Sequence, residues 1–281
     1  MSDKKKVNYQ EQKPTETKFM KFMEILKTRF WNIAKYNMIC VGIYALFIVF
    51  YAFFVSQIYF PIDVSDYQQG YSNFGELWAI LILRIPYTLV FFTIPVVAFG
   101  PAVSGLAVVF RSYVRRDDSF SSDFGDGMKK FFWKSLAVTA ISTVITVCLG
   151  IAARFYQLNL QAGFWKTALL LIIGGFSLLF IMMHMYIYQI LVEYNLSIWK
   201  LYRYSYVFAI LRFFPNLLII AGIAALTILP FKIHILFGAV VMATVLFGLT
   251  SYIINFFTWP ALEKHLDPIM KEQRINKVKL Y

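Results

Sequence analysis

The side chains that usually carry out acid–base or metal chemistry are few in this sequence, and they are scattered. The three histidines, His184, His234 and His265, fall in different segments of the chain. A three-histidine metal site is therefore not expected, because its ligands must converge on one ion. The two cysteines, Cys40 and Cys148, both lie inside apolar runs and show neither a disulfide framework nor metal-ligand spacing.

Catalytic motifs are also missing from the sequence. The P-loop motif of ATPases, the HExxH motif of zinc proteases and the GxSxG motif of hydrolases do not occur. We therefore predict a protein that is not an enzyme and that holds no metal or cofactor.

Three polar side chains lie within apolar runs, where they could contact a substrate or hold helices together: Arg84, His184 and Asn216. Arg84 would cost roughly 2.5–3.5 kcal/mol at the centre of a bilayer. It therefore either reaches the nearby membrane surface or contacts a substrate or a partner. His184 is either a hydrogen-bonded histidine between helices or part of a binding site. Asn216, like Asn255, is expected to hydrogen-bond between helices.

The elements that would position these residues are long apolar segments. Apolar residues make up 59% of the chain and charged residues 15%, compared with about 25% charged residues in soluble domains. A helix needs about 20 apolar residues to cross a bilayer. We predict an all-α integral membrane protein with six transmembrane helices, at 38–60, 77–110, 135–153, 167–192, 213–231 and 235–259.

The distribution of positive charge predicts which side of the membrane each segment faces. The net charge is +12, and 23 of the 27 Lys and Arg fall before residue 38, in 111–134, in 193–214 or after residue 257. These basic segments alternate with segments that hold few cations, which is the positive-inside pattern of multi-pass proteins. We predict that both termini are cytoplasmic, at the cell membrane. The basic residues would then meet anionic lipid headgroups rather than nucleic acid.

The two ends of the chain differ from the apolar centre. Residues 1–17 are polar and Lys-rich, which predicts a disordered tail. Residues 18–36 place apolar and basic side chains on opposite faces of a helix. Such an amphipathic helix either lies on the membrane surface or packs on the ends of the spans. The membrane domain would cover 37–259, and 260–281 would be a cytoplasmic tail.

The run 77–110 contains a predicted hinge. As one straight helix it would be roughly 50 Å long at about 1.5 Å per residue, which is too long for a single untilted crossing. Pro95, Gly100 and Pro101 provide a break, because each proline removes a helical hydrogen bond. Small residues near Gly105 would let a neighbouring helix approach closely. The break is either a structural hinge or, as in some transporters, the lining of a binding site.

The next segment, 111–134, is predicted to be a cytoplasmic surface for a partner or for lipid headgroups. It begins with a cluster of arginines. It continues as a short helix with an apolar stripe and nearby lysines, and the next span begins at residue 135. The residues of this surface are Arg111, Arg115, Arg116, Phe124, Met128, Lys129, Lys130 and Phe131.

A set of short motifs links the chain to a known family. The motifs are Pro95, Gly100-Pro101-Ala102, Arg111, Arg115-Arg116, Asp123-Phe124 and Lys129-Lys130-Phe131-Phe132. Together they resemble the YesL-like family of bacterial membrane proteins, which is defined as a domain of unknown function. Further matches, which extend the resemblance over most of 20–255, are Asn37, Tyr186, Val192 to Ser197 and Pro215. Glu193-Tyr194-Asn195 departs from the basic–aromatic–acidic run of that family.

The resemblance implies a role in sugar uptake. Members of the family are often encoded beside carbohydrate importers of the ATP-binding cassette (ABC) type in Gram-positive bacteria. It therefore implies an accessory subunit whose partners are ABC importer permease subunits.

Three functions are consistent with these observations. The first is a non-catalytic accessory or scaffold subunit of an oligosaccharide importer. The second is an autonomous small-molecule permease, which would need a continuous polar cavity near Arg84, the Pro95–Pro101 break and His184. The third is a lipid-dependent membrane sensor that uses the Lys-rich N-terminal helix.

Overall fold

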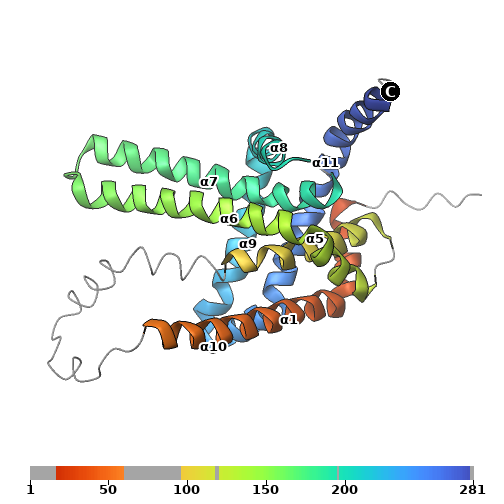
Figure 1. Ribbon diagram of the computed structural model, residues 1–281, viewed down its shortest axis with the longest axis horizontal. Helices are drawn as coiled ribbons and strands as arrows, with labels where there is room; N and C mark the ends of the chain where they lie inside the picture. The colour runs from red at the N-terminus through yellow and green to blue at the C-terminus, as the bar shows by residue number, and fades with distance from the viewer. Residues whose placement is uncertain (1–16, 60–95, 118–119, 195, 279–281) are drawn as a thin grey trace, which may run out of the picture.

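The computed structural model describes residues 17–59, 96–117, 120–194 and 196–278, and the regular structure in these ranges is entirely helical (Figure 1). Arg84 and Pro95 lie outside the described residues, together with the rest of 60–95 and the tail up to residue 16. The elements are α1 (Lys18–Tyr59), α5 (Gly100–Arg115), α6 (Ser121–Asn159), α7 (Phe164–Glu193), α8 (Ile198–Leu211), α9 (Phe213–Ile233), α10 (Ile235–Val241), the π-helix η1 (Met242–Leu246) and α11 (Phe247–Val278).

Five helices of the described chain are long and apolar enough to cross a membrane. The most apolar stretches of α6 and α9 have only 11% of their residues buried, and large exposed apolar surfaces of this kind require a lipid or protein cover. The helices are Val96–Arg115, Ser122–Asn159, Phe164–Glu193, Phe213–Ile233 and Ile235–Lys271. These observations indicate an all-helical, multi-pass membrane protein. A sixth span, which would fall within α1, and the side on which the termini lie stay predictions.

Two predicted element boundaries are wrong, because α1 and α6 are each a single continuous helix. We expected a surface helix at 18–36 before the first span, and a short helix in 111–134 before the span at 135. Residues 18–41 and 128–149 contain neither glycine nor proline, so nothing in the chain ends either helix. The change from charged to apolar residues marks a change of surroundings and not a change of structure. With 39 residues, α6 extends roughly 58 Å at about 1.5 Å per residue.

The described part of the predicted hinge is a turn at Phe99. The Phe99 N–H donates to the Val96 carbonyl at 3.2 Å, and α5 begins at the next residue with a proline in its first turn. Pro101 has no N–H to give to the preceding helical turn, and this explains why regular helical bonding restarts here. The chain thus changes from one helical segment to another within 96–100.

Small residues let α5 and α6 approach closely, as predicted. A Cβ atom added to Gly105 would lie 2.8 Å from the Phe124 carbonyl oxygen of α6. One added to Gly100 would lie 2.8 Å from the Ser135 carbonyl oxygen and would overlap the Thr139 hydroxyl. The contact therefore depends on backbone meeting backbone without a side chain between, as in other close membrane helix pairs.

A buried asparagine joins α1 to the π-helix η1. The Nδ2 group of Asn37 donates to the carbonyls of Ala243 at 2.6 Å and Met242 at 3.3 Å, and its Oδ1 accepts from the Gly248 N–H at 2.8 Å. Asn37 is fully buried. A π-helix shifts the backbone hydrogen bonds and leaves carbonyls without their usual partners, and here the side chain of another helix satisfies them.

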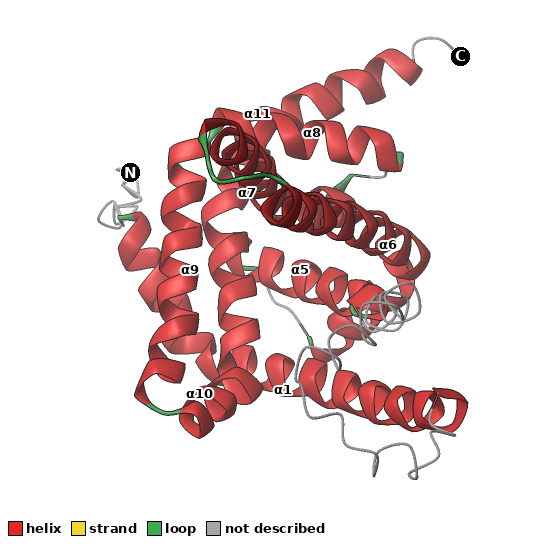
Figure 2. Cartoon of the chain, turned by 90° about the vertical axis from the view of Figure 1, so that its left-hand side faces the viewer, coloured by secondary structure: helices red, strands yellow, loops and turns green. Residues whose placement is uncertain are grey.

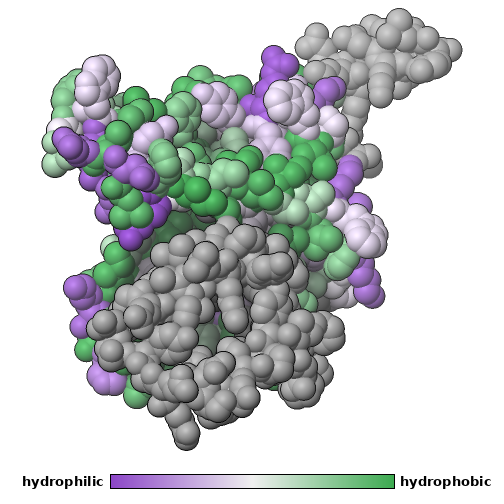
Figure 3. Space-filling view, turned by 60° about the vertical axis from the view of Figure 1, so that its left-hand side comes forward, coloured by the Kyte–Doolittle hydropathy of each residue, from purple (hydrophilic) through white to green (hydrophobic). Residues whose placement is uncertain are grey.

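The helices form a packed part and a projecting arm. Figures 1 and 2 show α6 and α7 as a long antiparallel hairpin, which α9 and the beginning of α11 cross rather than accompany. No residue of 143–181 is buried, and we call this stretch the hairpin arm. Hydrophobic residues cover a broad part of the face shown in Figure 3. The core lies instead where α5, the second half of α7 and α11 meet.

Candidate functional site

Two arginines of α5 converge on one carboxylate at the end of α7. Arg111 forms an ion pair with Glu193 through Nη1 and also donates to the Val192 carbonyl at 3.4 Å. The Nη2 of Arg115 lies 3.2 Å from the other carboxylate oxygen of Glu193. All three side chains are only 20–30% exposed. These contacts fasten α5 to α7, and the surface for a partner or for lipid headgroups that we predicted at Arg111 and Arg115 stays a prediction.

Helix α11 joins the same cluster. The guanidinium carbon of Arg115 lies 4.5 Å from the ring centre of Trp259, which is only 1% exposed. The Tyr194 hydroxyl donates to the Asp267 carboxylate. Burial, and then that acceptor, raise the pKa of Tyr194 above its ordinary value, so the phenol remains a donor. We call Arg111, Arg115, Glu193, Tyr194, Trp259 and Asp267 the junction.

Helix α1 packs beside the junction. The Lys21 ammonium donates to the Val114 carbonyl near the end of α5 at 2.9 Å, where the negative end of the helix dipole favours a cation. Arg116 pairs with Glu24 at 2.7 Å, and this pair is exposed. Of the two alternatives for 18–36, the structure shows the packed one, with Ile33 fully buried. The opposite face exposes apolar side chains at Phe19, Met20, Met23 and Trp31.

Part of the apolar stripe of 120–134 packs against neighbouring helices, whereas Phe132 is exposed. Phe124 is 5% exposed, and its ring lies 5.7 Å from that of Tyr36. Met128 is half-buried against Gly105. The half-buried Phe131 ring lies under the ammonium of Lys130. The small face of α5 accepts these bulky groups. Of the surface that we predicted, Arg116, Lys129 and Lys130 are exposed.

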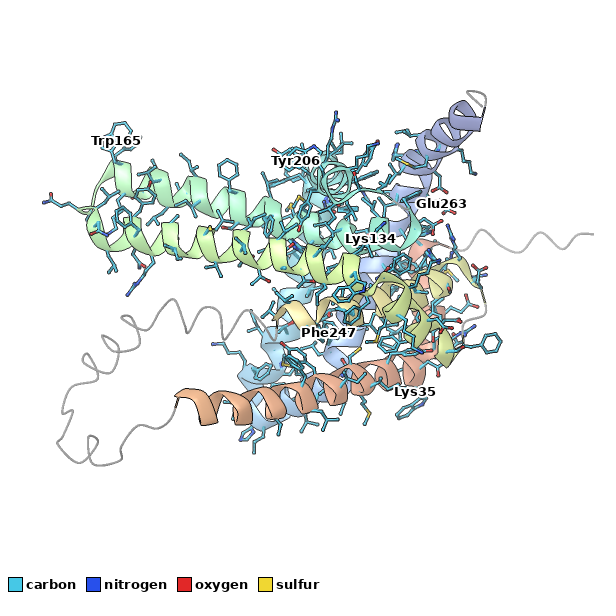
Figure 4. All side chains as sticks on the ribbon, viewed as in Figure 1. Lys35, Lys134, Trp165, Tyr206, Phe247 and Glu263 are labelled. Atoms are coloured by element: carbon cyan, nitrogen blue, oxygen red, sulfur yellow. The ribbon has the colours of Figure 1, made fainter. Side chains whose placement is uncertain are left out.

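A basic cavity of about 640 Å³ opens beside the junction. Five Lys and Arg line it, and Glu263 is the only carboxylate among the lining residues. Three aromatic residues also line it. Figure 4 places Glu263 at the opposite end of the molecule from Trp165, which marks the tip of the α6–α7 hairpin. The lining residues are Lys18, Lys21, Val114, Arg115, Arg212, Phe256, Phe257, Trp259, Pro260, Ala261, Glu263, Lys264 and His265.

Cationic and apolar side chains line the cavity together. Arg212 is held in place by a hydrogen bond from Nη1 to the Phe257 carbonyl at 3.0 Å, and Arg115 is held by Glu193 and Trp259. A guanidinium has five N–H donors and an ammonium has three, so donors remain after these contacts. Such a site favours an anion that several donors can share.

No sequence motif points to this cavity. Its lining comes from four segments, near residues 18–21, 114–115, 212 and 256–265, which the fold brings together from distant places. Each segment by itself resembles an ordinary basic segment next to a predicted span. The lone signal in the right place was the excess of cations on one side of the predicted membrane.

The other predicted site residues are separated from this cavity. Asn216 accepts from the Tyr186 hydroxyl at 2.6 Å and so links α9 to α7, as predicted. Asn255 bonds instead to Ser251 in its own helix, at 2.8 Å. His184 bonds the Phe180 carbonyl of its own helix at 2.8 Å, and among the described residues it has no hydrogen bond to another helix. It lines a groove between α6 and α7.

Neither a known relative nor a group of metal ligands assigns a function to the described chain. No protein-family model, curated protein or solved structure matches the chain. Within the described ranges, no group of three or more His, Cys, Asp and Glu residues lies close enough together to hold a metal ion. The YesL-like resemblance accordingly stays a prediction.

Proposed function

We propose that this chain is a non-catalytic membrane protein that binds the phosphate group of an anionic phospholipid in the basic cavity. The observation that supports the proposal is the cavity lining, with five Lys and Arg against one Glu, together with three aromatic residues. Arginine and lysine are the usual ligands of phosphate. The apolar wall suits the glycerol and the first methylene groups of a lipid.

Lipid binding in the cavity would stabilise the packing of α1 against the other helices. The cavity lies between α1, α5 and α11 and shares Arg115 and Trp259 with the junction. A bound phosphate would offset repulsion among cations that the fold brings together. It would thereby favour the arrangement in which α1 packs against the other helices. The function is then that of a membrane component whose assembly depends on lipid composition.

The predicted orientation fits this proposal. The positive-inside pattern puts the beginning of α1 and the part of α11 that line the cavity toward the cytoplasmic side. That leaflet carries the anionic lipids in most cell membranes, and its surface potential attracts basic segments. The same distribution of charge was the basis for expecting anionic headgroups as partners.

Lipid retention tests the proposal. The purified protein is exchanged from detergent into a mixture of phosphatidylglycerol and phosphatidylcholine, and the bound lipid is counted by native mass spectrometry. We expect preferential retention of phosphatidylglycerol, and several-fold weaker retention in the double variant Lys18→Ala/Lys264→Ala. Both lysines are exposed, so their loss should leave the fold intact.

A matched variant controls for net charge. Lys129→Ala/Lys200→Ala removes two exposed lysines that do not line the cavity, and we expect normal retention. Equal loss in both double variants would contradict a specific site. Competition by soluble glycerol phosphate at concentrations similar to those of the lipid would instead assign the site to a soluble phosphate ester.

The association with a carbohydrate importer is a separate proposal that rests on the resemblance alone. It is tested by mild-detergent purification of the tagged protein from its host. Recovery of importer permease subunits in fixed ratio would support an accessory subunit, and recovery of the chain alone would contradict it.

A further inference from the structure

A groove of about 490 Å³ runs between α6 and α7, away from the basic cavity. On α6 its polar residues are Thr139, Ser142, Thr143 and Thr146, and the three threonines share one helix face because Thr143 and Thr146 follow Thr139 by four and seven residues. On α7, His184 and Tyr188 face them one turn apart. The Tyr202 hydroxyl donates to the Val138 carbonyl, so Ser142 is the donor in its 2.7 Å contact with that hydroxyl. Most of the remaining wall is apolar.

The hydroxyl groups of the threonines in this groove already donate hydrogen bonds. The Thr143 hydroxyl donates to the Thr139 carbonyl at 2.7 Å, and that of Thr146 donates to the Ser142 carbonyl at 2.9 Å. A hydroxyl has one proton and two lone pairs. Because a backbone carbonyl can only accept, both threonines are left with acceptor capacity and no donor.

His184 and Tyr188 also donate their protons to other groups and leave acceptors in the groove. The Phe180 carbonyl lies 2.8 Å from Nδ1 of His184, so the neutral ring carries its proton on Nδ1 and Nε2 is an acceptor. Thr139 gives its proton to the Ser135 carbonyl at 2.7 Å. Tyr188, whose oxygen lies 2.7 Å from that of Thr139, must therefore be the donor in that pair. The phenol oxygen is then an acceptor too.

The groove thus presents acceptors on both walls, and its own donors are already used. An anion would meet only lone pairs. A cation would have to lose its hydration among apolar side chains in a candidate membrane span, which is costly. A neutral hydroxyl group supplies the missing donor, and an attached hydrocarbon chain suits the apolar wall.

We propose that this groove binds an uncharged apolar alcohol, whose hydroxyl donates to His184 Nε2 or to the threonine oxygens of α6. The proposal is independent of the anionic lipid site, because the two sites have opposite requirements. The basic cavity has spare donors and takes a phosphate, whereas the groove has spare acceptors and takes a hydroxyl.

The test compares an alcohol with a matched molecule that cannot donate. A diazirine-bearing dodecanol and its methyl ether are each crosslinked to the purified full-length protein in detergent, and the labelled peptides are located by mass spectrometry. We expect labelling of the α6 and α7 peptides at the groove to be about threefold to tenfold stronger with the alcohol, which corresponds to one ordinary hydrogen bond.

Variants identify the groove as the site. Thr143→Val/Thr146→Val and His184→Phe remove acceptors while keeping side-chain size, and both should reduce the preference for the alcohol. Thr227→Val is the matched control, because the Thr227 hydroxyl on α9 also donates to a carbonyl of its own helix, at 2.8 Å from Ile223, and does not line the groove. Equal labelling by alcohol and ether in the wild type, or no labelling of these peptides, would overturn the proposal. Elution of each variant as a single symmetrical peak in size-exclusion chromatography reports that it is folded.

Discussion

The two halves of α7 lie in different surroundings although both are apolar. Between Phe164 and Ile181 no residue is buried, whereas nearly every residue from Met182 to Val192 is buried against other helices. The same contrast holds along α6, whose beginning packs on α5 and whose end belongs to the hairpin arm. Both the packed part and the arm are apolar, but only the packed part contacts other helices extensively.

The difference shows which residues hold the molecule together. In the arm, apolar side chains point outward, where a bilayer would cover them. In the packed part, the helices are joined by specific groups: buried amides, one shared carboxylate and glycines at close backbone contacts. Substitutions of the same type should consequently have large effects in the packed part and small effects in the arm or at the exposed surface.

The largest effect is expected at Asn37. Asn37→Ala leaves two partly buried carbonyls of η1 and the buried N–H of Gly248 in α11 without their side-chain partner, at about 1–3 kcal/mol for a buried group left unsatisfied. We expect the free energy of unfolding, measured by SDS titration in mixed micelles, to fall by about 3 kcal/mol. Asn159→Ala is the control in the arm, since Asn159 is exposed and bonds only its own helix. A similar loss in both variants would contradict the comparison.

A smaller loss is expected at the junction. Glu193→Gln removes the charge that Arg111 and Arg115 share, and leaves two partly buried cations uncompensated. The free energy of unfolding should fall by about 2 kcal/mol. Glu24→Gln breaks a pair whose side chains are 41% and 55% exposed, and should cost about 0.5 kcal/mol. If Glu193→Gln were as mild as Glu24→Gln, the junction would not be holding α5 to α7.

The third effect comes from glycine and has opposite signs in the two regions. Gly100→Ala places a methyl group against the Ser135 carbonyl and the Thr139 hydroxyl, and overpacking of this kind costs about 1–3 kcal/mol. Gly174→Ala in the arm meets nothing within 4 Å, and should stabilise the helix by about 0.5–1 kcal/mol. The apparent melting temperature in detergent should therefore fall for the first variant and rise or stay constant for the second. A fall in both would indicate that the arm is packed as well.

The sequence was informative about elements and less so about their ends. Long apolar runs predicted membrane helices because length and hydropathy are local properties. The end of a helix needs a local signal as well, and none exists around residues 36 or 134, so α1 and α6 continue past both predicted boundaries. Asn216 was interpreted correctly because a buried amide in an apolar helix must find a partner. Asn255 found one in its own helix, which its sequence context does not distinguish.

The site was harder to predict because its residues come from segments that are far apart in the sequence. The stripe at Phe124 and Met128 has the same spacing whether it faces lipid, a partner or α5, and only the small residues of α5 decide between these. Likewise, Arg111 and Arg115 looked like surface cations because their partner, Glu193, is about 80 residues away. The basic cavity depends on this long-range pairing.

The clamp between Asn37 and η1 also has a consequence for biogenesis. Its partners Met242, Ala243 and Gly248 follow Asn37 by 205, 206 and 211 residues. At a translation rate of about 5–20 residues per second, α1 would wait roughly 10–40 s for them. During that time α5 and α6, which are neighbours in sequence, can already pair. Asn37 thus gains these partners only late in synthesis, although α1 precedes the other described helices in the chain, and a nascent chain that stops before Gly248 would carry α1 without the complete clamp.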